Sequence, residues 1–214
     1  MSEKARKAFE ERGYRMEWEL KQQTLGLPDT KWAPIVLDWA TKHWGVQDPP
    51  SMPDFLRQHD NIMKDQIPDV QACKGAKELM KKLCQMQGNE KKDLQLAIAT
   101  SSHQESVRQK RIKHEDTIFA NLDALVAGDD PNVKNGKPAP DIYVEAARRI
   151  EVDPKQCIVF EDGMPGVRSG KAAGCFVIAV PDPRFEAEER KQFAQEADLV
   201  LDDLTQFDPN WLLL

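Results

Sequence analysis

Short apolar runs alternate with helical patterns over the C-terminal two thirds of the chain. The apolar runs, which suit buried strands, lie at 94–99, 124–127, 157–160, 176–180 and 199–201. The segments with helical spacing lie at 75–87, 105–113, 140–150, 166–173 and 184–196. Short apolar strands that alternate with helices of about ten residues indicate an α/β fold, in which helices cover both faces of a parallel sheet.

The first 70 residues follow a different pattern. Their apolar positions recur at helical spacing, as in Ile35 and Trp39, and no β-rich run is present. Prolines at 28, 34, 49, 50, 53 and 68 predict that this part is divided into several short helices. The pattern therefore predicts a helical unit over 1–70 and an α/β unit over 71–214.

Composition and charge narrow the class of protein. The 214 residues include 30 basic and 36 acidic ones, for a net charge of −6, and no concentrated basic stretch is present. We therefore expect no nonspecific binding to nucleic acid or to an anionic membrane. No apolar run approaches the length of a membrane span, and the four cysteines show no metal-ligand spacing. These features predict a cytoplasmic protein with reduced thiols, and they leave the oligomeric state open.

Three groups of polar residues follow apolar runs, where the carboxyl ends of parallel strands place binding sites. In the first, the run at 94–99 leads to Thr100 and Ser101 at the start of a helix. Hydroxyls and free backbone N–H groups at a helix start bind anions, and the helix dipole favours this. Alternatively, Ser102 and Glu105 form a capping box, which would give this stretch a purely structural role.

The second candidate is Lys137, which lies between Gly136 and Pro138 in a loop that connects a strand to a helix. The glycine and the proline fix the backbone on either side, which suits a point charge aimed at a phosphate group. The alternative interpretation is an ordinary solvated surface lysine.

The third candidate is a pair of adjacent acids, Glu161 and Asp162, directly after the run at 157–160. Two neighbouring carboxylates at the end of a buried strand repel each other and resist desolvation, so something must compensate them. A Mg²⁺ ion would, because it binds through one or two carboxylates, water and phosphate oxygens. Alternatively, Asp162 caps the helix that begins near Gly166, which leaves Glu161 without a role.

Together the three groups resemble a known family. Thr100 after a strand, Lys137 in "GKPAPDIY" and the acids of "VFEDGMPGV" resemble the second, third and fourth motifs of the haloacid dehalogenase superfamily. The stretch 94–214 resembles its branch of pseudouridine-5′-phosphatases, glycerol phosphatases and β-phosphoglucomutases. The resemblance implies a Rossmann-like core over 71–214, a helical cap over 1–70, and hydrolysis of a small phosphorylated metabolite with Mg²⁺ as cofactor.

The resemblance also implies a role for each candidate. Thr100 and the backbone of Ser101 would hold the transferring phosphoryl group. Lys137 would balance negative charge, and Glu161 and Asp162 would bind Mg²⁺ directly or through water. Positioning and neutralisation of charge supply most of the catalysis in phosphoryl transfer.

One element of the family pattern is absent from the sequence. The first motif of the family is an apolar strand that ends in Asp-x-Asp-Gly, whose first aspartate attacks phosphorus and whose second is the general acid and base. No Asp-x-Asp occurs in the 214 residues, and the run before Asp38 continues with helical spacing. We therefore expect the central strand of the sheet and the nucleophile to be missing from this stretch.

Two explanations of the missing motif compete. Either residues upstream of Met1 carry it and the protein is a phosphatase, or the chain is a non-catalytic relative that binds phosphate or a partner protein. The retained Thr100, Lys137, Glu161 and Asp162 favour the first explanation, because all four are still the residue types that catalysis needs.

Overall fold

The computed structural model describes residues 14, 17–64, 67–89 and 94–213. The α-helices are α2 (Trp18–Thr24), α3 (Asp29–His43), α4 (Met52–Lys64), α5 (Ala76–Asn89), α6 (Gln104–His114), α7 (Asp141–Arg149), α8 (Met164–Ala173) and α9 (Ala187–Glu196). The strands are β1 (Ala97–Ala99), β2 (Ala124–Val126), β3 (Ile158–Glu161), β4 (Phe176–Ala179) and β5 (Leu199–Val200). Short 3₁₀ helices are η1 (Ile67–Asp69), η2 (Pro154–Gln156), η3 (Leu204–Gln206) and η4 (Pro209–Leu213).

The predicted α/β fold is confirmed, and its strands fall into two separate parallel sheets. One sheet has the order β1-β2 and the other has the order β3-β4-β5. Every adjacent pair is parallel, as between Ala97 and Ala124 or between Ile158 and Phe176. Strands β1 and β3 are not paired with each other. Within the described residues, the two sheets are therefore separate at the position where the sequence predicts a missing central strand.

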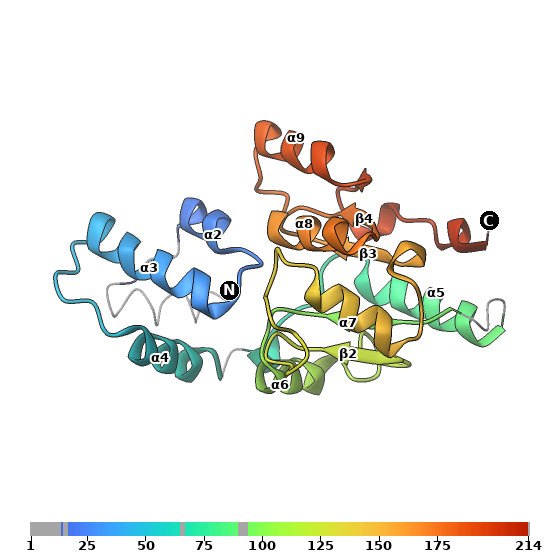
Figure 1. Cartoon of the computed structure of the whole chain (residues 1–214), viewed down its shortest axis with the longest axis horizontal. Coiled ribbons are helices and arrows are strands. Elements are labelled where there is room, and N and C mark those ends of the chain that lie inside the picture. Colours follow the sequence, from blue (N-terminus) through green and yellow to red (C-terminus); the bar gives the residue numbers. More distant parts are fainter. Residues whose placement is uncertain (1–13, 15–16, 65–66, 90–93, 214) are drawn as a thin grey trace.

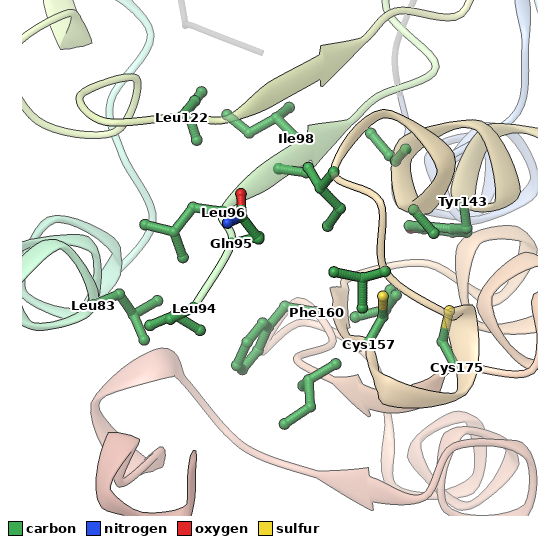
Figure 2. Close-up of a pocket in the computed structure, with 18 of the residues that line it drawn as sticks. Leu83, Leu94, Gln95, Leu96, Ile98, Leu122, Tyr143, Cys157, Phe160 and Cys175 are labelled. Atoms are coloured by element: carbon green, nitrogen blue, oxygen red, sulfur yellow. The ribbon is translucent and has the colours of Figure 1, made fainter. Parts of the chain in front are cut away.

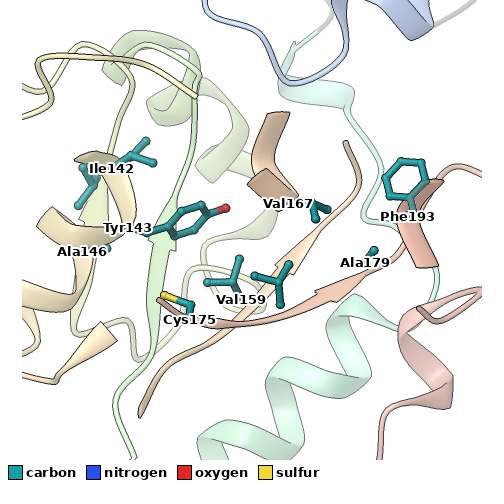
Figure 3. Packing of buried hydrophobic residues seen from close by; sticks show 10 residues of the cluster. Ile142, Tyr143, Ala146, Val159, Val167, Cys175, Ala179 and Phe193 are labelled. Carbon is teal, nitrogen blue, oxygen red and sulfur yellow. The ribbon is translucent and has the colours of Figure 1, made fainter. Parts of the chain in front are cut away.

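Helices cover both faces of the larger sheet, as the apolar strands predict. Side chains of β3 and β4 alternate, so that Val159 and Val177 face a cluster with α7, α8 and α9, while Ile178 belongs to a cluster with α5. Figure 3 shows the first cluster, where Tyr143 from α7 and Val167 from α8 lie over Val159 and Cys175. Because both faces are covered, the strands are apolar at consecutive positions.

The helical part of the chain has a core of its own. Helices α2, α3 and α4 lie to one side of the sheets in Figure 1. Their inner faces bury Leu20, Ala33, Val36 and Phe55 in one cluster. One prediction here is wrong, because Pro34 lies inside α3 and does not end it. A proline removes one backbone hydrogen bond, and burial of the residues on either side of it offsets that loss.

Two further predictions concern the thiols and the membrane. All four cysteines are free, as the sequence predicts; the strand-like runs also suggest burial of Cys157 and Cys175, and Cys175 is buried whereas Cys157 is half-buried. Among the helices in the described ranges, none combines the length and the apolar character that crossing a lipid bilayer requires.

Candidate active site

Lys137 is buried at the carboxyl ends of β1 and β3. Only 6 % of its surface is exposed, so the alternative interpretation as a solvated surface lysine is wrong. Its Nζ donates to the carboxylate of Glu161 at the end of β3 and lies 3.4 Å from the carbonyl oxygen of Ala99 at the end of β1. The Lys137 ammonium therefore links the two sheets. It contacts the residue that precedes Thr100 in sequence, and it lies beside the acidic pair.

Glu161 is held by two donors at one oxygen. Lys137 Nζ and the hydroxyl of Tyr143 both donate to Oε1. The Lys137 ammonium also lies 5.0 Å from the centre of the Tyr143 ring, within the range of cation–π attraction. Burial raises the pKa of Tyr143 well above its usual value, and the charge of Glu161 raises it further. The tyrosine therefore stays protonated and acts as a hydrogen-bond donor.

Gly166 provides the space for the Glu161 side chain. A β-carbon at position 166 would overlap the Glu161 carboxylate, so the first turn of α8 needs a glycine there. The N-cap of α8 is Gly163, without a side-chain cap, so the interpretation of Asp162 as the cap is wrong. Both acids are therefore free of a capping role.

Asp162 is the accessible member of the pair. Its side chain has exposed surface, although the protein around the carboxylate removes solvent and raises its pKa. The charge of Glu161 raises the pKa of Asp162 further, and Lys137 and Lys21 lower it. A cation placed at Asp162 would relieve this unfavourable environment.

The donor set at this position fits Mg²⁺. In the described ranges, no group of three or more His, Cys, Asp or Glu side chains gathers in a metal-binding arrangement. Mg²⁺ needs no such group, because it takes one or two carboxylates and completes its shell with water and phosphate oxygens. Since Glu161 is turned toward Lys137 and Tyr143, Asp162 is the carboxylate available as a direct ligand.

Thr100 and Ser101 follow β1 as predicted, but the capping box does not form. The Oγ1 of Thr100 accepts from the N–H of Ser102 at 3.1 Å, which orders the turn. The N-cap of α6 is His103, and Glu105 pairs with Arg108 at 2.6 Å.

The N-terminus of helix α6 is bound by a side chain from another segment of the chain. Its first N–H, that of Gln104, donates to the carboxylate of Asp129 at 2.9 Å. The hydroxyl of Ser102 accepts instead from Lys110 at 2.8 Å. The capping box was the wrong interpretation, because a carboxylate from the loop after β2 accepts the hydrogen bond from the first backbone N–H of the helix.

The loop between α2 and α3 covers this site. The Oγ of Ser101 donates to the carbonyl of Gly26 at 3.3 Å. Pro28 packs on Gly136, where a β-carbon would lie 3.0 Å from the proline ring. Residues far apart in sequence thus meet over Lys137. The resemblance implies a helical cap over 1–70, but sequence reasoning did not assign these contacts, and it missed Tyr143, although Tyr143 is part of the "GKPAPDIY" stretch.

Asp38 is not placed as a nucleophile. It is exposed on α3 and pairs with Lys42 at 2.8 Å, one helical turn away. This confirms that the run before Asp38 is helical.

An ionic network fixes the loop that carries Lys137. Arg149 Nη1 donates to the carbonyl of Leu125 at 3.0 Å, and Nη2 pairs with Asp130 at 2.5 Å. Its Nε donates to Glu145 at 2.7 Å. The hydrogen bond from Arg148 and then that from Arg149 lower the pKa of Glu145 to about 2, against the effect of burial.

We expect this network to lose its contribution to stability in acid. Because the pKa of Glu145 is depressed in the folded state, its contribution is complete above the unfolded value of about 4.3 and disappears as the pH falls toward about 2. Urea unfolding at a series of pH values should show Glu145→Gln losing less stability between pH 5 and pH 2 than the unchanged chain does. The exposed Glu151→Gln is the control and should follow the unchanged chain; an identical profile for Glu145→Gln would contradict the assignment.

The sequence of the chain is similar to those of a known protein family. Residues 2–180 match the family model of haloacid dehalogenase-like hydrolases. The chain is 35% identical over 196 residues to (DL)-glycerol-3-phosphatase 1, mitochondrial, of Arabidopsis thaliana, covering 90% of this chain and 61% of that protein. It therefore spans less than two thirds of that relative.

A second relative and a solved structure are also similar. The chain is 33% identical over 195 residues to a protein named "Probable pseudouridine-5′-phosphatase" of Drosophila melanogaster, covering 90% of this chain and 77% of that one. The crystal structure of β-phosphoglucomutase from Clostridium difficile superposes with a TM-score of 0.72 and 18% identity, covering 97% of this chain and 85% of the other. That likeness concerns the fold alone.

Proposed function

Because the chain belongs to the haloacid dehalogenase-like hydrolase family, we propose that its site serves the Mg²⁺-dependent hydrolysis of a phosphate monoester of a small metabolite. The observation that carries this proposal is Lys137, a buried cation held by Glu161 where β1 and β3 end. A buried lysine at the carboxyl ends of parallel strands suits an anionic ligand. Relatives named as phosphatases of glycerol phosphate and of pseudouridine phosphate support the small-metabolite class.

Each residue has a role in this proposal. The Thr100 hydroxyl and the Ser101 N–H donate to phosphoryl oxygens, and Lys137 neutralises their charge. Asp162 would hold Mg²⁺, which would supply electrostatic stabilisation of the negative charge on the phosphoryl group. Glu161 fixes Lys137 and would contribute negative charge beside the bound metal. These groups position the phosphoryl group and neutralise its charge, and none of them attacks phosphorus.

The attacking carboxylate comes from outside these 214 residues in our proposal. A carboxylate oxygen would bond to phosphorus while the bond from phosphorus to the leaving alcohol breaks, and a second acid would protonate that alcohol. Water then releases the phosphate and restores the carboxylate. The absence of Asp-x-Asp from the sequence motivates this assignment, and the lack of pairing between β1 and β3 in the described part of the chain supports it.

Residues 1–70 would act as a cap domain on a core domain of residues 71–214. The α2–α3 loop already contacts Ser101 and Gly136 over the site. A cover of this kind excludes water and contacts the leaving group. Substrate choice would then depend on the cap.

A second candidate function is a non-catalytic module that binds phosphate. The lack of an Asp-x-Asp pair favours it, and the same Thr100, Lys137 and Asp162 would serve binding alone. The two functions differ in turnover, not in metal or phosphate affinity.

Metal binding tests the assigned site under either function. Calorimetric titration with Mg²⁺ should show Asp162→Asn binding at least about tenfold more weakly, because the direct ligand is lost. The exposed Glu188→Gln removes the same charge from α9 and should leave the affinity unchanged. Equal Mg²⁺ affinity in Asp162→Asn and the unchanged chain would remove Asp162 from the site.

A further inference from the structure

Lys110 differs from the arginines of the same helix, α6. Arg108 and Arg111 each pair with a glutamate at 2.6 Å. Lys110 is half-buried, and among the described residues no carboxylate lies within ion-pair distance of it. Its Nζ donates instead to the hydroxyl of Ser102 at 2.8 Å. The charge of Lys110 is therefore directed at a serine ahead of the helix and not at an acid.

The environment of Lys110 disfavours its positive charge. Burial removes water from the ammonium and lowers the pKa of Lys110 below its usual value. A neighbouring acid would oppose this effect, but the part of the chain that the structure describes places none there. An anion bound at the adjoining turn would supply the missing negative charge.

The geometry of α6 directs Lys110 toward Ser102. Side chains on an α-helix lean toward its N-terminus. Lys110 lies six residues after Gln104, the first residue of α6, which corresponds to a rise of about 9 Å. It follows Val107 by one turn, and Val107 is buried, so Lys110 lies beside the covered face of the helix. Its long side chain runs back along this face to the turn that precedes α6.

Ser102 completes the turn that the proposed function assigns to the phosphoryl group. Its N–H donates to the Oγ1 of Thr100 at 3.1 Å, and its carbonyl accepts from the N–H of Gly128 at 2.9 Å. Its hydroxyl accepts from Lys110. Ser102 is thus fixed through its N–H, its carbonyl and its hydroxyl. The hydrogen bond to Thr100 extends this fixed geometry to the side chain that would bind phosphate.

The other sides of the turn are held by neutral groups. The turn follows β1, whose Ile98 lies at the pocket between the two sheets (Figure 2). A β-carbon at Gly128 would overlap the carbonyl of Ser101, so the loop after β2 is in close contact with the turn. The hydroxyl of Ser101 donates to the carbonyl of Gly26. Lys110 therefore adds a positive charge to a turn whose other contacts in the described ranges are uncharged.

We propose that Lys110 is a positioning residue of the phosphate site, which holds the turn at residues 100–102 through Ser102 and adds a second positive charge to that of Lys137. Lys110 acts through Ser102 and Thr100 and does not itself touch the phosphoryl group. Donors and charges that are fixed in advance bind phosphoryl oxygens without a cost of reorganisation. The inference rests on the proposed function and deepens it by naming a residue on which phosphate binding depends.

Calorimetric titration of the 214-residue chain with inorganic phosphate, with Mg²⁺ present throughout, tests this role. Lys110→Met removes the charge but keeps a long unbranched side chain, and it should weaken phosphate binding about tenfold, as expected for one charge-assisted hydrogen bond. Lys110→Arg keeps the charge and the donors and should bind within about threefold of the unchanged chain. A merely structural role predicts no such rescue, because methionine fills the space as well as arginine does.

Two controls separate this inference from the proposed function. Lys113→Met changes an exposed lysine three residues farther along α6 and should leave phosphate binding unchanged. Thr100→Val removes the hydroxyl assigned to phosphoryl oxygens and should weaken binding at least as much as Lys110→Met does. A loss in Thr100→Val without a loss in Lys110→Met would overturn the role of Lys110 and leave the phosphate site standing. An unchanged chain that does not bind phosphate would overturn both.

A double-variant cycle tests the contact through Ser102. In a Ser102→Ala background, Lys110→Met should weaken phosphate binding by less than about threefold. A full tenfold loss in that background would show that Lys110 acts without Ser102 and would contradict the proposal.

A measurement on the unmodified chain remains decisive even if Lys110→Met does not fold. The ¹³Cε resonance of Lys110, assigned through its loss in Lys110→Arg, should shift when phosphate is added, whereas that of Lys113 should not. A Lys110 resonance that stays in place while phosphate binds would overturn the proposal.

Discussion

Replacing Glu161 with alanine is expected to lower the free energy of unfolding by about 3–5 kcal/mol, because removing one partner of a buried ion pair leaves the other charge uncompensated. The partner is Lys137, and each member of the pair is 7 % exposed at the side chain. Tyr143 also loses the carboxylate to which its hydroxyl donates. Urea unfolding monitored by tryptophan fluorescence measures the change.

Two further variants separate charge from volume. The exposed Glu188→Ala should change stability by less than about 0.5 kcal/mol. The double variant Lys137→Met, Glu161→Leu replaces the ion pair with apolar side chains and should recover much of the loss. A change below about 1 kcal/mol for Glu161→Ala would mean that the buried pair is not formed as described.

Adding a strand covalently should have an effect at least as large. A longer chain that carries an apolar five-residue strand ahead of Met1 should gain about 5 kcal/mol or more in unfolding free energy. About ten ladder hydrogen bonds at roughly 1 kcal/mol each and apolar side chains at about 1.5–3 kcal/mol each exceed the cost of ordering about five residues. For a chain of this length the melting midpoint should rise by about 10–20 °C, measured by calorimetry.

The matched control for the added strand is an extension of equal length in which serine replaces every apolar residue. It should melt with the 214-residue chain. Equal melting midpoints for the apolar and the serine extensions would show that no strand is missing between β1 and β3.

The fold was largely predictable because strand and helix periodicity are local. The five strands of the described ranges lie within the apolar runs, apart from one residue, Glu161, at the end of β3. The predicted strand at 94–99 is reduced to Ala97–Ala99, and in the described part of the chain this strand pairs with β2 alone. Pro34 was misjudged because burial of its neighbours outweighs its local tendency to end a helix.

The candidate site was predictable only in part. Thr100, Glu161 and Asp162 directly follow predicted strands, and Lys137 lies in a loop between a predicted strand and a helix, so their placement at the carboxyl ends of strands could be expected. Tyr143 could not be assigned, because nothing in its local pattern shows that its hydroxyl meets Glu161. The contacts of the α2–α3 loop with Ser101 and Gly136 could not be assigned for the same reason, since they join distant parts of the chain.

The central claim is that this site hydrolyses phosphate monoesters once a strand between β1 and β3 supplies the attacking carboxylate. The most direct measurement is turnover of p-nitrophenyl phosphate with Mg²⁺ by a chain extended with an apolar strand that ends in Asp-x-Asp. We expect turnover that requires Mg²⁺ and disappears in Lys137→Met and when the first added aspartate becomes asparagine, while the 214-residue chain alone stays inactive. Metal-dependent turnover by the 214-residue chain alone, abolished by replacing Asp38 or another of its own aspartates, would contradict the account.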